Sequence, residues 1–116
     1  MTFSVSRVER DGGGAARLRL TGELDLSTAP QLTTAIEELA AAGETRLLLD
    51  LTDLTFCDST GMAVFVRGDN QAAADGGWLR LTGANGRVER VLRVTGLADV
   101  LRHDPESLDP ASQAAS

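Results

Sequence analysis

The stretch LLLDLTDLTFCDSTGMAVFV, residues 47–66, decides the fold, and the rest of the chain is arranged around it. It opens with an apolar run too continuous for a half-exposed strand, which predicts a strand buried on both faces. A short polar link then leads to residues 58–61, where Asp58 or Ser59 can cap a new helix. Gly61 lets the first helical turn pack closely. We therefore expect hydroxyl groups at a helix N-terminus beside the end of a sheet, where a phosphoryl group can sit.

Composition limits the classes of function. The 116 residues are enough for one domain, and they carry a net charge of −6 with a pI of about 4.6. This acidity disfavours nucleic acid or an anionic membrane as a partner. The single cysteine, Cys57, permits no internal disulfide, which is typical of a reducing compartment. The chain does not open with a signal-peptide pattern, and no apolar run approaches the roughly 20 residues of a membrane span. We expect a cytoplasmic protein.

Before the central stretch, the pattern predicts an antiparallel hairpin. Polar and apolar residues alternate over residues 3–8 and again over 16–21, on either side of a glycine-rich turn at 11–14. Residues 22–26 are polar enough to leave the sheet as a loop. The first two strands should therefore pair with each other and bury one face.

A helix is predicted next. Ser27 or Thr28 can cap it, with Pro30 in the first turn, where a missing N–H costs nothing. Its buried stripe, at helical spacing, comprises Leu32, Ala35, Ile36, Leu39 and Ala40. The strand that follows, at 46–51, completes a strand–helix–strand unit, which implies a parallel pair with a right-handed crossover.

The second half continues this alternation of helix and strand. A helix after Ser59 should be followed by a strand at 78–82, a helix capped by Asn85 and stopped by Gly96, and a short strand or turn at 97–101. The residues expected to face inward from the helix after Ser59 are Met62, Phe65, Val66 and Ala73.

These elements predict an α/β fold. The expected order is β-β-α-β-α-β-α-β, a small, mixed and mostly parallel sheet that opens with an antiparallel hairpin and has helices packed against it. Residues 1–102 should form the single domain. Residues 103–116 form a polar tail, for which we expect disorder or a frayed helix.

Catalytic chemistry finds little support in the sequence. The only histidine, His103, lies beside the polar tail and far from any candidate nucleophile, so a catalytic triad is not expected. The chain has no lysine and hence no GxxxxGK[ST] loop. Asp50 or Asp53 resembles the aspartate of receiver domains only in outline, because the acidic pair and the lysine of those domains are missing. A metal site would need carboxylates alone. We expect no enzyme, no cofactor and no metal.

Two interpretations of the hydroxyl groups of Ser59 and Thr60 remain open. In the first, one hydroxyl accepts a phosphate, whose oxygens meet free backbone N–H groups and the positive end of the helix dipole. Such a phosphate adds about −1.5 to −2 charges and acts by repelling or blocking a partner. In the second, Asp58 and Ser59 only cap the helix, since many helices begin in this way.

Three motifs together resemble a known family. They read LTGELD at 20–25, LDL at 49–51 and FCDSTGM at 56–62, and they are similar to the STAS family, within it to the anti-sigma factor antagonists. The resemblance spans roughly residues 3–102 and includes the order of elements. The chain departs from the family at Thr60, where many members have a second serine, and at Met62, where leucine is more usual.

The resemblance implies a switchable binding protein rather than an enzyme. An anti-sigma factor that is also an ATP-dependent serine kinase would phosphorylate Ser59, with Thr60 as a secondary acceptor. The unphosphorylated antagonist would bind this anti-sigma factor and release the sigma factor. Phosphorylation would switch the binding off, and a PP2C-type phosphatase would restore it.

The resemblance also indicates where a partner would bind. Asp25 matches a family position beside the phosphoacceptor, Asp58 flanks the acceptor, and Gly61 and Met62 follow it on the same helix start. The family also includes sensor and scaffold modules that bind a small ligand or build an assembly. In that second hypothesis Ser59 is only a capping residue.

Overall fold

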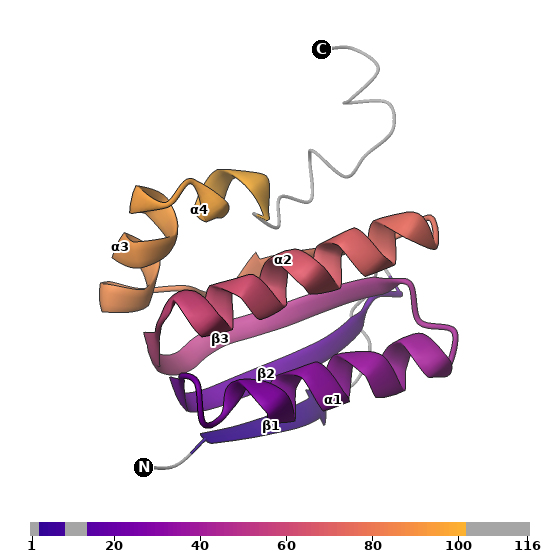
Figure 1. Cartoon of the computed structure of the whole chain (residues 1–116), viewed down its shortest axis with the longest axis horizontal. Coiled ribbons are helices and arrows are strands. Elements are labelled where there is room, and N and C mark those ends of the chain that lie inside the picture. Colours follow the sequence, from indigo (N-terminus) through magenta and orange to yellow (C-terminus); the bar gives the residue numbers. More distant parts are fainter. Residues whose placement is uncertain (1–2, 9–13, 102–116) are drawn as a thin grey trace.

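The computed structural model describes residues 3–8 and 14–101, and its strands form one four-stranded sheet (Figure 1). In chain order the elements are β1 (Phe3–Val8), β2 (Ala16–Leu24), α1 (Ala29–Ala41), β3 (Arg46–Cys57), α2 (Ser59–Ala74), β4 (Trp78–Thr82), α3 (Gly86–Val94) and α4 (Leu97–Val100). The sheet order is β1-β2-β3-β4. β1 and β2 are antiparallel, whereas β2 with β3 and β3 with β4 are parallel. The predicted α/β fold, with its opening hairpin and mostly parallel sheet, is confirmed.

The helices lie on one face of the sheet. α1 and α2, which connect the parallel strands, run side by side across this face, and α3 and α4 lie beyond α2 (Figure 1). The core fills the space between them and the sheet. It is built from alternate leucines of β2 and β3 and from the apolar sides of the helices, with Phe65 as its largest fully buried side chain.

Strand β3 is longer than the sequence pattern predicts. The apolar run ends at residue 51, where we expected a polar link, but the strand continues to Cys57. β2 likewise continues to Leu24 instead of leaving the sheet after residue 21, and Leu24 pairs with Cys57 through two irregularities in register. Leu54 and Cys57 are buried, whereas the polar residues of this extension, Thr52, Asp53 and Thr55, are exposed. Burial of these two side chains keeps a mostly polar segment in the sheet.

The inward face of α2 also differs from the prediction. Val66 and Ala73 are exposed, and the buried residues of the helix are Gly61, Val64, Phe65, Gly68 and Ala72. Small residues lie on the buried face of α2 because the helix packs closely against β4 and α1. A Cβ atom built on Gly68 would lie 2.7 Å from Leu79 Cδ1. Phe65 is buried and Met62 packs against the core, as predicted, so the prediction was wrong only at Val66 and Ala73.

The described chain ends in the helix α4, not in a terminal strand. β4 is an edge strand, and its outward N–H groups find partners without a fifth strand. The N–H of Leu81 donates to the carbonyl of Leu101 at 2.7 Å, and the N–H of Leu79 donates to Asp69 Oδ1 at 2.9 Å. The Asp69 side chain of α2 and the Leu101 carbonyl thus accept the hydrogen bonds that a fifth strand would otherwise accept from β4.

Some predictions fall outside the described residues. They are the turn at 11–14 apart from Gly14, the position of His103, and the division into a domain at 1–102 and a tail at 103–116. Within the described ranges, none of the helices combines the length and the apolar composition that crossing a bilayer requires.

A charged side chain is buried on the sheet face that points away from α1 and α2. Asp50 is 3% exposed, and its Oδ2 accepts a hydrogen bond from Arg17 Nη2 at 3.0 Å. Its Oδ1 accepts from the N–H and the hydroxyl of Thr52, at 3.0 and 2.6 Å. Burial raises the pKa of Asp50, but the bonds from Thr52 and the charge of Arg17 outweigh it, so the pKa lies below its ordinary value of 3.8. The carboxylate is fully partnered.

We predict that Asp50→Ala lowers the free energy of unfolding by about 1–3 kcal/mol, because the donors of Thr52 and Arg17 lose their acceptor. Asp53→Ala, an exposed position on the same strand, should change it by less than about 0.5 kcal/mol. Urea unfolding at pH 7 measures both. Because the pKa of Asp50 is lowered, its contribution is present above pH 3.8 and is lost as the pH falls through the folded-state pKa. Equal losses in the two variants would contradict this assignment.

Candidate functional site

The predicted phosphoacceptor lies where two parallel strands end together. β3 ends at Cys57 and α2 begins at Ser59, so only Asp58 separates strand from helix. The N–H of Asp58 donates to the carbonyl of Leu24, the last residue of β2, at 3.2 Å. This bond fixes the loop that precedes α1 beside the start of α2. The sheet therefore presents both loops at the same end of the molecule (Figure 1).

Asp58 is the cap of α2. Its Oδ1 accepts hydrogen bonds from the N–H groups of Thr60 and Gly61, at 2.9 and 3.1 Å. Its backbone is extended, as expected for a capping residue. The sequence allowed either Asp58 or Ser59 in this role, and the structure assigns it to Asp58. Two of the N–H groups expected to be free for a phosphate are therefore already taken.

The hydroxyl of Ser59 is available for chemistry. Ser59 is the first residue of α2, its side chain is exposed, and within the described part of the chain that side chain makes no hydrogen bond. Thr60, one position later, is half-buried. A modifying enzyme would reach Ser59 more easily than Thr60, and a group added to Ser59 would project into solvent.

Asp25 holds the loop that lies beside Ser59. Its Oδ1 accepts from the N–H and the hydroxyl of Ser27, at 2.9 and 2.7 Å, and from the N–H of Thr28 at 3.2 Å. The Thr28 hydroxyl in turn accepts from the Asp25 N–H at 2.9 Å, so the two residues bond each other reciprocally within the loop, although Thr28 makes no side-chain capping bond to α1. The hydrogen bond from the Ser27 hydroxyl, ahead of the other contributions, holds the pKa of Asp25 below its ordinary value of 3.8. Asp25 is thus a fixed negative charge at neutral pH.

Gly61 and Met62 point inward in this structure. Gly61 is buried, and a Cβ atom there would lie 2.7 Å from Leu24 Cδ2 and 3.0 Å from Cys57 Sγ. The helix start can pack onto the strand ends only because residue 61 has no side chain. Met62 is half-buried and packs against the core. The predicted site residues therefore divide into an outward group, Asp25, Asp58 and Ser59, and an inward pair that positions it.

The structure adds two residues that sequence reasoning missed. Leu26 follows Asp25 and is 74% exposed, which is unusual for a large apolar side chain. It lines a shallow hollow of about 330 Å³ together with Thr60 and with Arg67 of α2. In the sequence they were signalled only by a leucine in a polar loop and by the single basic residue of the helix that follows Ser59.

No metal centre is evident in the part of the chain that the structure describes. Among those residues, no group of three or more histidine, cysteine, aspartate or glutamate side chains is placed to hold an ion. Asp25 and Asp58 use their Oδ1 atoms to cap loop and helix instead. This arrangement offers an exposed hydroxyl next in sequence to the Asp58 cap, at the end of the sheet that also carries Asp25.

These features define a small α/β domain whose polar, solvent-facing site lies where two parallel strands end. Residues 8–103 match the family described as "Mlab, STAS domain", and the chain belongs to the STAS family. It is 33% identical to the anti-sigma-B factor antagonist of Listeria monocytogenes over 101 residues, 87% of this chain and 88% of the relative. The corresponding antagonist of Bacillus subtilis is 34% identical over 85 residues, 73% of this chain and 77% of that protein.

A solved structure agrees with these relatives. The crystal structure of an anti-sigma factor antagonist from Mycobacterium paratuberculosis superposes with a TM-score of 0.71 at 26% sequence identity, covering 97% of this chain and 93% of that one. The family predicted from the three sequence motifs is confirmed. The Listeria, Bacillus and Mycobacterium proteins all carry the name of anti-sigma factor antagonists.

We predict that Cys57, which underlies this site, is unreactive in the native protein. Burial, with a smaller contribution from the Asp58 carboxylate, raises the pKa of its thiol to about 12 from an ordinary value of 9.0. A disulfide reagent at pH 8 should therefore react slowly in buffer and rapidly in denaturant, because the thiolate is the nucleophile.

The same pKa predicts an alkaline loss of stability. Above pH 9 the unfolded thiol ionises while the folded thiol does not, so the free energy of unfolding should fall between pH 9 and about 12. Cys57→Ala is the control and should lack this part of the loss. Rapid labelling of the native protein at pH 8 would contradict the assignment.

Proposed function

We propose that this chain is an anti-sigma factor antagonist whose binding is switched by phosphorylation of Ser59. The observation that carries the proposal is the exposed hydroxyl of Ser59, which makes no hydrogen bond to the described residues and directly follows the helix cap that Asp58 supplies. The names of the relatives support the same class of function. The partner in this proposal is an anti-sigma factor that is also a serine kinase, and a PP2C-type phosphatase removes the phosphate.

Charge, rather than refolding, would operate the switch. The kinase would transfer the γ-phosphoryl group of ATP to Ser59 Oγ, with loss of the hydroxyl proton and release of ADP. The product gains about −1.5 to −2 charges at pH 7. Asp58 already occupies the N–H groups of Thr60 and Gly61, so the phosphate would face solvent beside two carboxylates, Asp25 and Asp58. A partner that fits the unmodified surface would then meet a strongly repulsive one.

In the alternative hypothesis, a STAS sensor or scaffold that binds a small ligand or an assembly partner, Ser59 only caps the helix. That role belongs to Asp58, whose side chain accepts both capping hydrogen bonds. A serine that is not needed for the helix is easier to explain as an acceptor. Thr60 remains the secondary acceptor in our proposal, disfavoured by its half-buried position.

We predict that incubation with a cognate serine-kinase anti-sigma factor and ATP adds one phosphate to the wild-type chain. Intact-mass analysis should show the addition in Thr60→Val and not in Ser59→Ala, since Ser59 is the exposed hydroxyl of the pair. Phosphate on Ser59→Ala but not on Thr60→Val would move the acceptor to Thr60. If no candidate kinase modified the wild-type chain, the proposed switch would be abandoned.

We also predict that Ser59→Asp weakens binding to the anti-sigma factor by about tenfold or more, through charge at an interface. Ser59→Asn has nearly the same shape without the charge and should bind within about threefold of the wild type, a difference below about 1 kcal/mol. Titration calorimetry gives both affinities, and circular dichroism should show the same fold for each variant. Equal losses for Asp and Asn would indicate a steric effect and contradict an electrostatic switch.

A further inference from the structure

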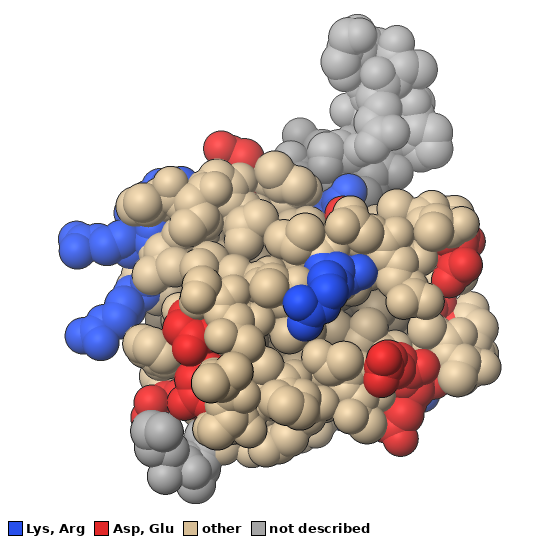
Figure 2. Space-filling view, viewed as in Figure 1, with Lys and Arg blue, Asp and Glu red and all other residues tan. Residues whose placement is uncertain are grey.

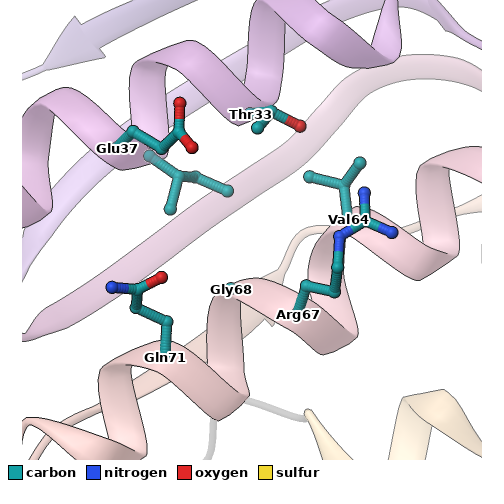
Figure 3. A pocket seen from close by; sticks show the side chains of 7 residues that line it. Thr33, Glu37, Val64, Arg67, Gly68 and Gln71 are labelled. Atoms are coloured by element: carbon teal, nitrogen blue, oxygen red, sulfur yellow. The ribbon is translucent and has the colours of Figure 1, made fainter.

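A furrow runs between α1 and α2, starting beside the proposed switch. Two adjoining hollows form it, of about 330 Å³ near the start of α2 and about 170 Å³ further along, and Thr33 and Arg67 line both of them. Thr33 and Glu37 face it from α1, and Arg67 and Gln71 face it from α2 (Figure 3). Thr60, the residue after Ser59, lines the end of the furrow near the start of α2. A partner that contacts Ser59 would therefore lie next to the furrow.

The furrow has a mixed apolar and polar lining. The end beside the switch is only partly apolar: Leu26, Ala29 and Pro30 line one part of it, and Leu26 is 74% exposed. Its walls then carry the hydroxyl-bearing side chains of Thr33 and Thr60. An exposed leucine over a partly apolar hollow is the kind of surface that a partner's apolar side chain covers.

Arg67 is the cation of this furrow. Glu37 lines the same hollow from α1, but within the described part of the chain the two side chains form no ion pair. Neither α1 nor α2 contains another basic residue. Arg17 and Arg80 are paired with Asp50 and Asp69, whereas Arg67 makes no ion pair or hydrogen bond within the described residues. In the space-filling view, one basic side chain stands alone in the middle of the helical face (Figure 2).

We propose that the furrow is a second contact surface for the same anti-sigma factor, which would place an apolar side chain against Leu26 and a carboxylate against Arg67. This inference rests on the proposed function and adds to it the contact that fixes the partner's orientation. The switch site carries the carboxylates of Asp25 and Asp58, and the furrow carries the guanidinium of Arg67, with Glu37 further along on the α1 side. A partner that matches this pattern can dock in one register only, because like charges would meet in any other.

A carboxylate is the anion that suits this position best in a protein partner. The chain carries a net charge of −6, which repels polyanions such as nucleic acid at long range. A single carboxylate next to apolar side chains avoids this repulsion, because it forms one local, bidentate pair with the guanidinium.

The test compares charge reversals on two exposed arginines. Affinity is measured by titration calorimetry with the serine-kinase anti-sigma factor that binds or phosphorylates the wild-type chain. Arg67→Glu should raise Kd by about tenfold to a hundredfold, the effect of replacing an attractive charge contact by a repulsive one. Arg87→Glu on α3 changes the net charge equally and should leave Kd within about threefold, a difference below about 1 kcal/mol. Leu26→Ser should raise Kd by about tenfold, as for an apolar contact residue.

Each outcome decides between the proposals. Wild-type affinity in Arg67→Glu and Leu26→Ser would overturn the furrow and leave the switch at Ser59 intact. Equal losses in Arg67→Glu and Arg87→Glu would also overturn it, since they would indicate long-range charge instead of a local contact. If the wild-type chain bound no serine-kinase anti-sigma factor, the proposed function would fail and the furrow proposal with it. Thermal unfolding of each variant is the control. Because the substituted side chains are exposed, the unfolding temperature should not change, and a loss of affinity then reflects a lost contact with the partner.

Discussion

The site depends on the parallel pairing of β2 and β3 and on the hydrogen bond that continues this pairing, from the Asp58 N–H to the Leu24 carbonyl. Because these strands end together, the loop before α1 and the start of α2 share one end of the sheet. Gly61 then lets the helix lie against the strand ends, where a side chain would collide with Leu24 and Cys57. Every charge and hydroxyl of the site is positioned by this short, buried junction.

The junction also separates the roles of neighbouring residues. Asp58 satisfies the helix start, and Asp25 and Thr28 satisfy each other in the adjacent loop. Within the described residues the side chain of Ser59 makes no hydrogen bond, so a change at its hydroxyl need not disturb the fold. This separation favours a switch that works by altering surface charge, and it is consistent with a small domain whose relatives act as antagonists of another regulator. In the furrow, Arg67 would supply the complementary charge that orients the partner.

Much of the fold followed from local patterns. Alternation over β1 and β2 predicted the hairpin, helical spacing predicted α1, and capping chemistry together with three family motifs placed Ser59 at the start of α2. What could not be predicted depends on tertiary contacts. Burial of Leu54 and Cys57 keeps a polar segment in β3, and Gly68 lets α2 lie close to β4 and α1. The furrow with Arg67 exists only because two helices far apart in sequence pack side by side.

The central claim is that Ser59 is the substrate of a kinase and not a structural residue. Phosphosite mapping of the protein purified from its own cells tests this most directly, because it requires no choice of kinase. The account predicts a phosphate on Ser59 in a fraction of the molecules that changes with growth conditions, while Thr60 is modified much less or not at all. Protein that carried no phosphate at Ser59 under any growth condition, or that was modified only at other positions, would contradict it.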